Sequence, residues 1–436
     1  MTDSPDFTVS VDQNPYLAAG ATQVDAIVTV TATGDAAGDP AGSRPAGDAL
    51  EVIIVDCSGS MHGDKIASAR RATSVAIKQI RDGVSFAVIA GTHQAALLYP
   101  TGGGTAVASP TTRAEAIGMM SRLRADGGTA IGAWLALAGQ LAEQHPGPLR
   151  HAILLTDGQN GERPEDLAWY LDSVLGRFVC DCRGVGADWK VDELRQIASA
   201  LLGSVDIVAD PADLAADFRA IMASAMDKRM AEVALRLWTP RTAAIRFVKQ
   251  VAPTVEDLTG RRTEIAPQRG DYPLGSWGAE SRDYHVCVDV QPGALGDEML
   301  AARVTLVAAG SDDALGQGLV RAVWTEDTAL ATGISRGVAH YTGQAELAAA
   351  IQEGLAARKA GDQVTATTQL GRAVALATAS GNGDTARLLE RVVDVVDAPS
   401  GTVRLRADVA DLDEMTLDTR STKTVRVRTD AGSERS

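Results

Sequence analysis

One stretch constrains the fold of this chain more than any other: residues 52–61, Val-Ile-Ile-Val-Asp-Cys-Ser-Gly-Ser-Met. Its first four residues are β-branched and too few for a helix, which predicts a strand buried on both faces of a parallel sheet. Asp56 follows where that strand ends, and Ser58 and Ser60 lie in the next loop. Open α/β sheets bind ligands at this edge. One carboxylate and two hydroxyls there predict an all-oxygen site that suits Mg²⁺.

Two further oxygen ligands follow along the chain. Thr129 lies in a glycine-rich turn that opens an expected helix, and Asp157 ends the apolar strand 152–156. Because parallel strands end at one edge of a sheet, these side chains are expected to join the first three. The alternative interpretation of residues 56–60 is a strand-end turn capped by aspartate and serine.

The set Asp56-x-Ser58-x-Ser60, Thr129 and Asp157 resembles the metal-ion-dependent adhesion site of von Willebrand factor type A (VWA) domains, and all five positions match in order. The resemblance covers about residues 50–228 and suggests an intracellular bacterial member of the family. It implies that Ser58 and Ser60 ligate Mg²⁺ or Mn²⁺ through Oγ. Thr129 would bind directly in one conformation and through water in another. Asp56 and Asp157 would hold coordinated waters or, in one state, the metal itself. One position stays open for an Asp or Glu of a protein partner.

Composition narrows the function classes. The chain has 436 residues, enough for about two to four domains, and a net charge of −15 that argues against nucleic-acid and anionic-membrane partners. Its start is neither basic nor apolar, and no run of about eighteen apolar residues occurs, so we expect no export signal and no membrane span. Four cysteines are too few for a disulfide scaffold, which favours reduced thiols and the cytoplasm.

The periodicity of apolar residues divides the chain. Alternating strand and helix signals over residues 46–228 predict a doubly wound, mostly parallel α/β sheet. Period-two alternation over residues 229–326 predicts an antiparallel β-sandwich. Residues 1–45 contain two more alternating strands and a Gly-, Ala- and Pro-rich linker. Since two strands cannot form a domain alone, we expect them to join the sandwich, with the α/β domain inserted between its parts.

Helical periodicity returns in residues 327–397, where Leu347 and Ile351 share one face, and predicts a small helical domain. Residues 398–436 are expected to be a flexible tail. Thr419, Thr422 and Thr424 lie there among basic residues and are candidate phosphorylation sites. Phosphothreonine would form a docking peptide for an Arg-lined signalling domain. The alternatives are an unmodified solvated tail and an edge strand added to a sheet of this chain or of a partner.

The leading hypothesis is a non-catalytic, Mg²⁺-dependent adaptor or scaffold that captures a partner carboxylate. No poised general base is evident: the six histidines are scattered, and only His62 lies beside the metal loop, where it is interpreted as a solvated residue. A metal-dependent phosphatase with Asp56 as nucleophile is one alternative. It would resemble the haloacid dehalogenases, which place a second aspartate where this chain has Ser58. A surface adhesin is the other alternative, and the expected lack of an export signal disfavours it.

Intracellular proteins that resemble this family often act as adaptors for AAA+ ATPases, and others belong to signalling systems. The sequence contains no nucleotide-binding loop, so we expect any ATPase partner to be a separate chain. The sequence does not choose between an ATPase and a phosphothreonine-binding protein as the partner.

Overall fold

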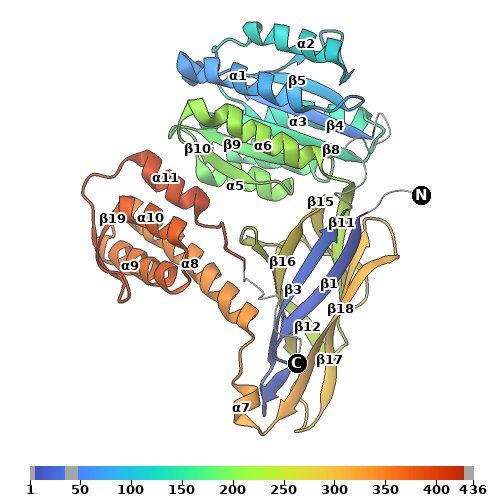
Figure 1. The fold of residues 1–436 in the computed structure, drawn as a ribbon, viewed down its shortest axis with the longest axis vertical. Coiled ribbons are helices and arrows are strands. Elements are labelled where there is room, and N and C mark those ends of the chain that lie inside the picture. Colours follow the sequence, from blue (N-terminus) through green and yellow to red (C-terminus); the bar gives the residue numbers. More distant parts are fainter. Residues whose placement is uncertain (1–4, 35–47, 427–436) are drawn as a thin grey trace, which may run out of the picture. The chain divides into compact units, whose positions relative to one another are not determined.

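The computed structural model describes residues 5–34 and 48–426. They form two compact units that interleave along the chain (Figure 1). Of the described residues, unit 1 comprises residues 5, 34, 48–232 and 275–279, and unit 2 comprises residues 6–33, 233–274 and 280–426. The expected linker falls on residues 35–47, which lie outside the described residues.

Unit 1 is built on a seven-stranded sheet whose main path runs β10-β9-β8-β4-β5-β6, with β7 paired to β5. The strands are β4 (Ala49–Asp56), β5 (Ser85–Gly91), β6 (Ala95–Tyr99), β7 (Ala106–Val107), β8 (Leu149–Thr156), β9 (Val179–Val185) and β10 (Val205–Val208). β4 pairs in parallel with both β5 and β8, while β6 and β7 are antiparallel to β5. Every residue of β4 is buried, as expected for a central strand covered on both faces.

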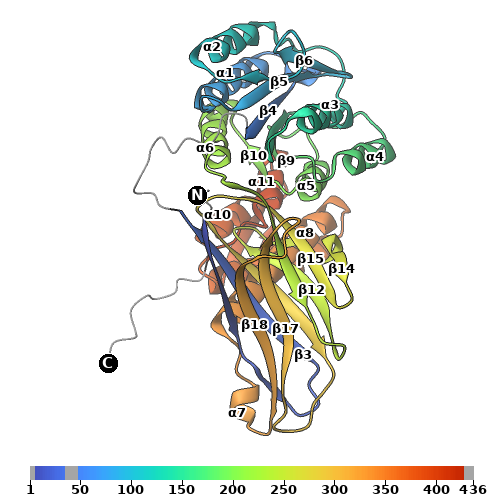
Figure 2. The same ribbon diagram turned by 90° about the vertical axis from the view of Figure 1, so that its right-hand side faces the viewer.

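Helices cover both faces of this sheet (Figure 2). One layer contains α1 (Asp64–Gln79), α2 (Pro110–Met119) and α6 (Leu214–Met226), and the other contains α3 (Ile131–Gln144), α4 (Pro164–Val174) and α5 (Val191–Ala200). The first layer shares one apolar core with the sheet, in which Ile77 and Phe218 pack against Ile53 and Phe86. The predicted doubly wound α/β fold is therefore confirmed.

Unit 2 contains two largely antiparallel sheets. The first runs β1-β3-β16-β12-β13, with β1 (Asp6–Gln13), β3 (Gln23–Thr33), β12 (Ala243–Ala252), β13 (Glu256–Asp257) and β16 (Ser281–Val290). The second runs β14-β15-β11-β17-β18-β2, with β2 (Tyr16–Ala18), β11 (Met230–Trp238), β14 (Thr263–Ala266), β15 (Arg269–Trp277), β17 (Glu298–Ala308) and β18 (Ala314–Thr325). Because β3 pairs with β16, the N-terminal strands complete the sandwich, and the predicted insertion is confirmed.

The C-terminal part of unit 2 is helical. It contains α7 (Thr328–Ala331), α8 (Arg336–Lys359), α9 (Gln363–Ala379), α10 (Gly383–Val392), the hairpin strands β19 (Val393–Asp397) and β20 (Thr402–Leu405), and α11 (Asp411–Arg420). Leu417 of α11 and Val403 of β20 are buried in one core with Ile351 and Leu370. The expectation of a flexible tail is therefore wrong for residues 402–426, because their few apolar side chains complete the helical core.

The segment after α11 is fixed against the sandwich of unit 2. Thr424 donates from its amide to the Pro253 carbonyl at 3.0 Å and from Oγ1 to the Val251 carbonyl at 2.6 Å. Lys423 forms an antiparallel bridge with Thr254. Of the alternatives considered for the tail, the structure therefore fits pairing with a sheet of the same chain. Residues 427–436 lie outside the described residues.

This arrangement affects the accessibility of the three candidate phosphorylation sites. Thr419 is only 1 % exposed in α11, and Thr422 and Thr424 are half-buried. The Thr422 carbonyl accepts a hydrogen bond from the Val255 amide at 2.8 Å. A kinase needs an exposed, extended peptide, so modification of Thr419 would require α11 to unfold, and modification of Thr422 or Thr424 would require the segment to detach. Phosphorylation of these threonines stays a prediction.

Candidate metal centre

The two aspartates of the expected site lie at the carboxyl ends of adjacent parallel strands. Asp56 is the last residue of β4, and Asp157 directly follows β8. Since Val55 pairs with Leu155, the two strands end at the same level of the sheet. Both aspartates are 0 % exposed. The fold thus buries two carboxylates side by side at the edge where α/β sheets bind ligands.

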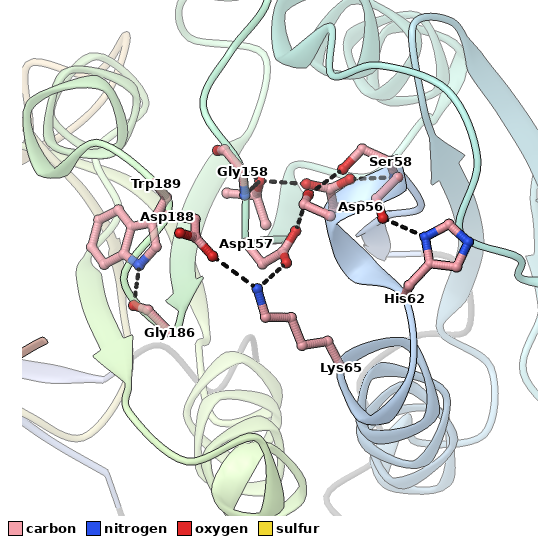
Figure 3. A network of polar contacts seen from close by, with 12 residues as sticks. Asp56, Ser58, His62, Lys65, Asp157, Gly158, Gly186, Asp188 and Trp189 are labelled. Carbon is pink, nitrogen blue, oxygen red and sulfur yellow. Dashed lines mark hydrogen bonds and ion pairs between the residues drawn. The ribbon is translucent and has the colours of Figure 1, made fainter.

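Asp56 is held by neutral donors. Its Oδ1 accepts the Ser58 amide at 2.7 Å, and its Oδ2 accepts Thr156 Oγ1 at 2.5 Å (Figure 3). Burial raises the pKa of Asp56, and although these hydrogen bonds oppose it, the nearby charge of Asp157 acts in the same direction as burial. The charged form of Asp56 would therefore be stabilised by a cation.

The hydroxyls converge beside these carboxylates. Ser58 Oγ and Ser60 Oγ lie 2.9 Å apart, and Ser60 Oγ donates to Asp157 Oδ1 at 2.6 Å. A Cβ atom placed on Gly158 would lie 3.2 Å from Ser60 Oγ, 3.3 Å from Thr129 Oγ1 and 3.7 Å from Ser58 Oγ. The three predicted hydroxyl ligands therefore surround one point next to Gly158. Ser60 is exposed, so this cluster reaches the surface of unit 1.

Backbone hydrogen bonds fix the loops that carry the hydroxyls. The Gly59 amide donates to the Gly127 carbonyl at 2.9 Å, and the Gly161 amide donates to the Thr129 carbonyl at 2.7 Å. Gly127 has a φ of +81°, a conformation that favours glycine. The loops after β4 and β8 are therefore each tied to the loop that presents Thr129.

A lysine that the sequence analysis did not single out completes the network. Lys65, in the first turn of α1, donates from Nζ to Asp157 Oδ2 at 2.6 Å and to Asp188 Oδ2 at 3.1 Å (Figure 3). Desolvation lowers the pKa of Lys65, but its hydrogen bonds and charge interactions with the two aspartates outweigh this and raise it. The ammonium is thus a charged partner of one expected metal ligand.

Other residues near the loop are less informative. His62 is exposed, and one of its ring nitrogens contacts the Gly59 carbonyl, in agreement with its interpretation as a solvated residue. Cys57 is buried, and desolvation raises the pKa of its thiol to about 12. The sequence pattern identifies Thr156 only as the end of a strand, yet its hydroxyl is one of the two hydrogen-bond donors that fix Asp56.

The donor set fits a hard dication. The described residues contain no group of three or more His, Cys, Asp or Glu placed to hold a metal ion. The cluster beside Gly158 instead combines three hydroxyls with two buried carboxylates, and oxygen donors of this kind suit Mg²⁺ or Mn²⁺. With Lys65 and its two carboxylate partners counted beside Asp56, the charged groups carry a formal net charge of about −2, so a further cation would be favoured.

Comparison with known proteins agrees with the fold. The von Willebrand factor type A domain family matches residues 51–207, and the von Willebrand factor type A C-terminal domain family matches residues 375–421. A solved structure described as a von Willebrand factor type A protein from Catenulispora acidiphila is 52 % identical, with 98 % of each chain covered and a TM-score of 0.92. The chain therefore belongs to the von Willebrand factor type A family.

Two further relatives are more distant in sequence. The ArnB paralog VWA2 from Sulfolobus acidocaldarius is 16 % identical over 96 % of this chain and all of its own length, with a TM-score of 0.57, and supports the fold alone. An uncharacterized protein from Synechocystis sp. is 29 % identical over 213 residues, which are 48 % of this chain and 49 % of the relative. The chain spans about half the length of that curated relative. No helix in the described ranges has the length and apolarity to cross a membrane.

Proposed function

We propose that this chain is a non-catalytic, Mg²⁺-dependent module for binding another protein. Ser58, Ser60 and Thr129 would hold the ion through their hydroxyls, while Asp56 and Asp157 balance its charge. The ion would then bind an Asp or Glu side chain of a partner at its open position. Mn²⁺ has the same preference for oxygen ligands and is the alternative ion.

The buried carboxylates carry this proposal. Asp56 and Asp157 are both 0 % exposed, and a buried charge is costly unless it is paired. Lys65 pairs with Asp157, whereas Asp56 accepts hydrogen bonds from the neutral Ser58 amide and Thr156 hydroxyl. Three hydroxyls beside them supply further oxygen ligands, and Ser60 opens the cluster to solvent. VWA domains mediate protein interactions, which supports a binding role for an ion in this place.

A binding role fits these side chains better than phosphatase chemistry. A phosphatase that uses Asp56 as nucleophile would need a general acid two residues later, and that residue is Ser58, whose Oγ lies 2.9 Å from Ser60 Oγ. The protonation behaviour of a serine hydroxyl does not suit it as a general acid near neutral pH. We therefore propose that the ion binds a partner and performs no hydrolysis.

The proposed setting is the cytoplasm, with a protein partner. All four cysteines, Cys57, Cys180, Cys182 and Cys287, are buried and free, which supports a reducing compartment. An AAA+ ATPase on a separate chain stays a predicted partner class. A phosphothreonine-binding partner would first require release of the segment that holds Thr422 and Thr424.

Titration of Mg²⁺ into the full chain tests the proposal. Calorimetry should detect one site in the wild type and a large loss of affinity when Ser58 and Ser60 are both replaced by alanine. Ser173→Ala is the matched control, because the hydroxyl of this exposed serine donates to the Tyr170 carbonyl within the same helix. An unchanged Mg²⁺ affinity in the double variant would contradict the proposed site. Mg²⁺-dependent release of phosphate from p-nitrophenyl phosphate, lost in the same variant, would contradict the non-catalytic role.

A further inference from the structure

Lys65 lies beside the proposed metal centre but not among the three hydroxyl groups of that centre. Asp157 uses its two oxygens differently: Oδ1 accepts Ser60 Oγ, and Oδ2 accepts Lys65 Nζ. The three atoms nearest to a Cβ on Gly158 are the hydroxyl oxygens, and Lys65 is not among them. The ammonium and Ser60 therefore bind different oxygens of Asp157, and Figure 3 shows Lys65 reaching Asp157 from the side away from Ser58.

Asp188 gives the same ammonium a second partner. The side chain of Asp188 is 71 % exposed, whereas that of Asp157 is fully buried. Asp188 lies in the turn after β9, where Trp189 is buried and donates from Nε1 to the Gly186 carbonyl at 2.9 Å. This tryptophan anchors the turn, which keeps Asp188 within reach of Lys65. A small movement of the Lys65 ammonium can thus strengthen its contact with either carboxylate.

The position of Lys65 changes the charge of the loaded centre. Asp56, Asp157 and Asp188 with a dication would carry a formal charge of about −1, and Lys65 raises this sum by one charge to about zero. A positive charge close to a dication opposes its binding, and it also attracts an anion that binds afterwards.

We propose that Lys65 is a built-in competitor of the metal, which lowers affinity for the dication and raises affinity of the loaded centre for an anionic partner group. When the dication binds, the Lys65 ammonium moves away from Asp157 and pairs with Asp188. This inference rests on the proposed Mg²⁺-dependent binding function. It makes Lys65 and Asp188 positioning and charge-tuning residues rather than metal ligands.

The test measures Mg²⁺ binding to the full chain by calorimetry. K65M removes the charge and should bind Mg²⁺ about tenfold more tightly or better. K65Q should show a similar gain, since its amide still donates a hydrogen bond but carries no charge. K190M is the matched control, because Lys190 is an exposed lysine that pairs with Glu193 at 3.0 Å, and its Mg²⁺ affinity should stay within about twofold of the wild type.

The role of Asp188 is tested by a double-mutant cycle. D188N should weaken Mg²⁺ binding severalfold in the wild type, because Lys65 then rests on Asp157 alone. In the K65M background the same substitution should have little effect. An equal effect of D188N in both backgrounds would mean that Asp188 does not act through Lys65, and it would overturn that part of the proposal.

The anionic half of the proposal is tested with acetate as the probe. Saturating acetate should raise the apparent Mg²⁺ affinity of the wild type more than that of K65M. Weaker Mg²⁺ binding by both K65M and K65Q would show that Lys65 supports the metal site and would overturn the inference. The melting temperature of each metal-free variant reports whether it folds. If the wild type itself binds no Mg²⁺, the proposed function fails; if it binds and neither Lys65 variant binds more tightly, only this inference fails.

Discussion

Two buried carboxylate sites in this chain differ in how their charge is balanced. Asp283, in β16 of unit 2, accepts hydrogen bonds from Thr29 Oγ1, from the Tyr341 hydroxyl and from Nε and Nη2 of Arg426. Burial raises its pKa, but these donors, Arg426 first among them, outweigh burial and lower it. At Asp56 in unit 1, burial prevails over neutral donors, and the pKa is raised.

The difference separates a structural site from a candidate functional one. A buried carboxylate that has a guanidinium and two hydroxyls as partners is complete and links its neighbours together. Among the described residues, the hydrogen-bond donors to the Asp56 carboxylate are the neutral Ser58 amide and Thr156 hydroxyl. An external cation can therefore still stabilise the charged form of Asp56. Four substitutions or conditions test this contrast.

The largest expected effect is on the affinity of the metal centre. Asp56→Asn keeps the size of the side chain and removes its charge, so we expect Mg²⁺ affinity to fall about a hundredfold. The free energy of unfolding of the metal-free chain should stay within about 1 kcal/mol of the wild type, because a buried charge is lost. Calorimetry and denaturant unfolding measure the two quantities. Asp166→Asn, at an exposed carboxylate paired with Arg163, is the control. A strong loss of metal-free stability would place Asp56 in the same class as Asp283.

Arg426→Met should produce the reverse pattern. It leaves Asp283, 3 % exposed, without its guanidinium, and we expect the free energy of unfolding to fall by about 2–3 kcal/mol, since the arginine itself is partly exposed. Mg²⁺ affinity should not change. Arg406→Met is the matched control, because Arg406 pairs with Asp394 on the surface and should contribute less than about 1 kcal/mol. Equal losses in the two variants, measured by urea unfolding, would remove the distinction.

A third, largely buried charged cluster allows the contrast between paired and unpaired buried charges to be tested by a change of pH. His151 Nδ1 lies 2.8 Å from Glu51 and Nε2 lies 3.0 Å from Asp181. Burial lowers the pKa of His151, but the two carboxylates outweigh it and raise the pKa from 6.5 to about 10. The protonated imidazole therefore makes its whole contribution to the free energy of unfolding below pH 6.5, and this contribution is lost as pH rises toward 10. We expect unfolding free energy to fall by about 2 kcal/mol across that range, after a discount for partial exposure. His151→Gln should flatten the profile; the same slope in both proteins would rule out this pair as its cause.

The smallest effect is expected at Thr424. Thr424→Val keeps the shape of the side chain and removes the hydrogen bond from Oγ1 to the Val251 carbonyl, so unfolding free energy should fall by about 1 kcal/mol. Limited proteolysis after residue 420 should become faster as the segment detaches more often. Thr367→Val on the exposed face of α9 is the control, because its hydroxyl contacts only the Gln363 carbonyl one turn away. No change in either measurement would show that the Thr424 hydroxyl does not help to hold the segment, which its backbone hydrogen bonds and Arg426 would then fix.

The sequence was informative where local patterns decide the structure. An apolar run followed by Asp-x-Ser-x-Ser defines a strand and the loop after it, and the order of such units determines which edges meet. The partners of Lys65 could not be read in this way, because Asp157 and Asp188 lie 92 and 123 residues away. A lysine in the first turn of a helix carries no local signal that identifies a carboxylate partner.

The C-terminal region misled the sequence analysis for a physical reason. α11 carries acidic and polar residues on most of its surface, and it buries Met415 and Leu417 beside two threonines, so its apolar signal is weak. Arg426 looked like one basic residue among several, although it is the partner of a carboxylate 143 residues earlier. A sparse apolar pattern can belong to a docked helix when the rest of the domain supplies the core.

The insertion of unit 1 also determines the order in which the sandwich can form during synthesis. Thr31 of β3 meets Ser281 of β16 across 250 residues, so the first hairpin leaves the ribosome long before its partner strand exists. At about 5–20 residues per second, the hairpin waits for roughly 12 to 50 seconds. During that time the apolar side chains of β3, such as Val28 and Val30, have no sheet to pack into. Unit 1 can fold within this interval, and the newborn chain would be most prone to aggregation or chaperone binding just before β16 emerges.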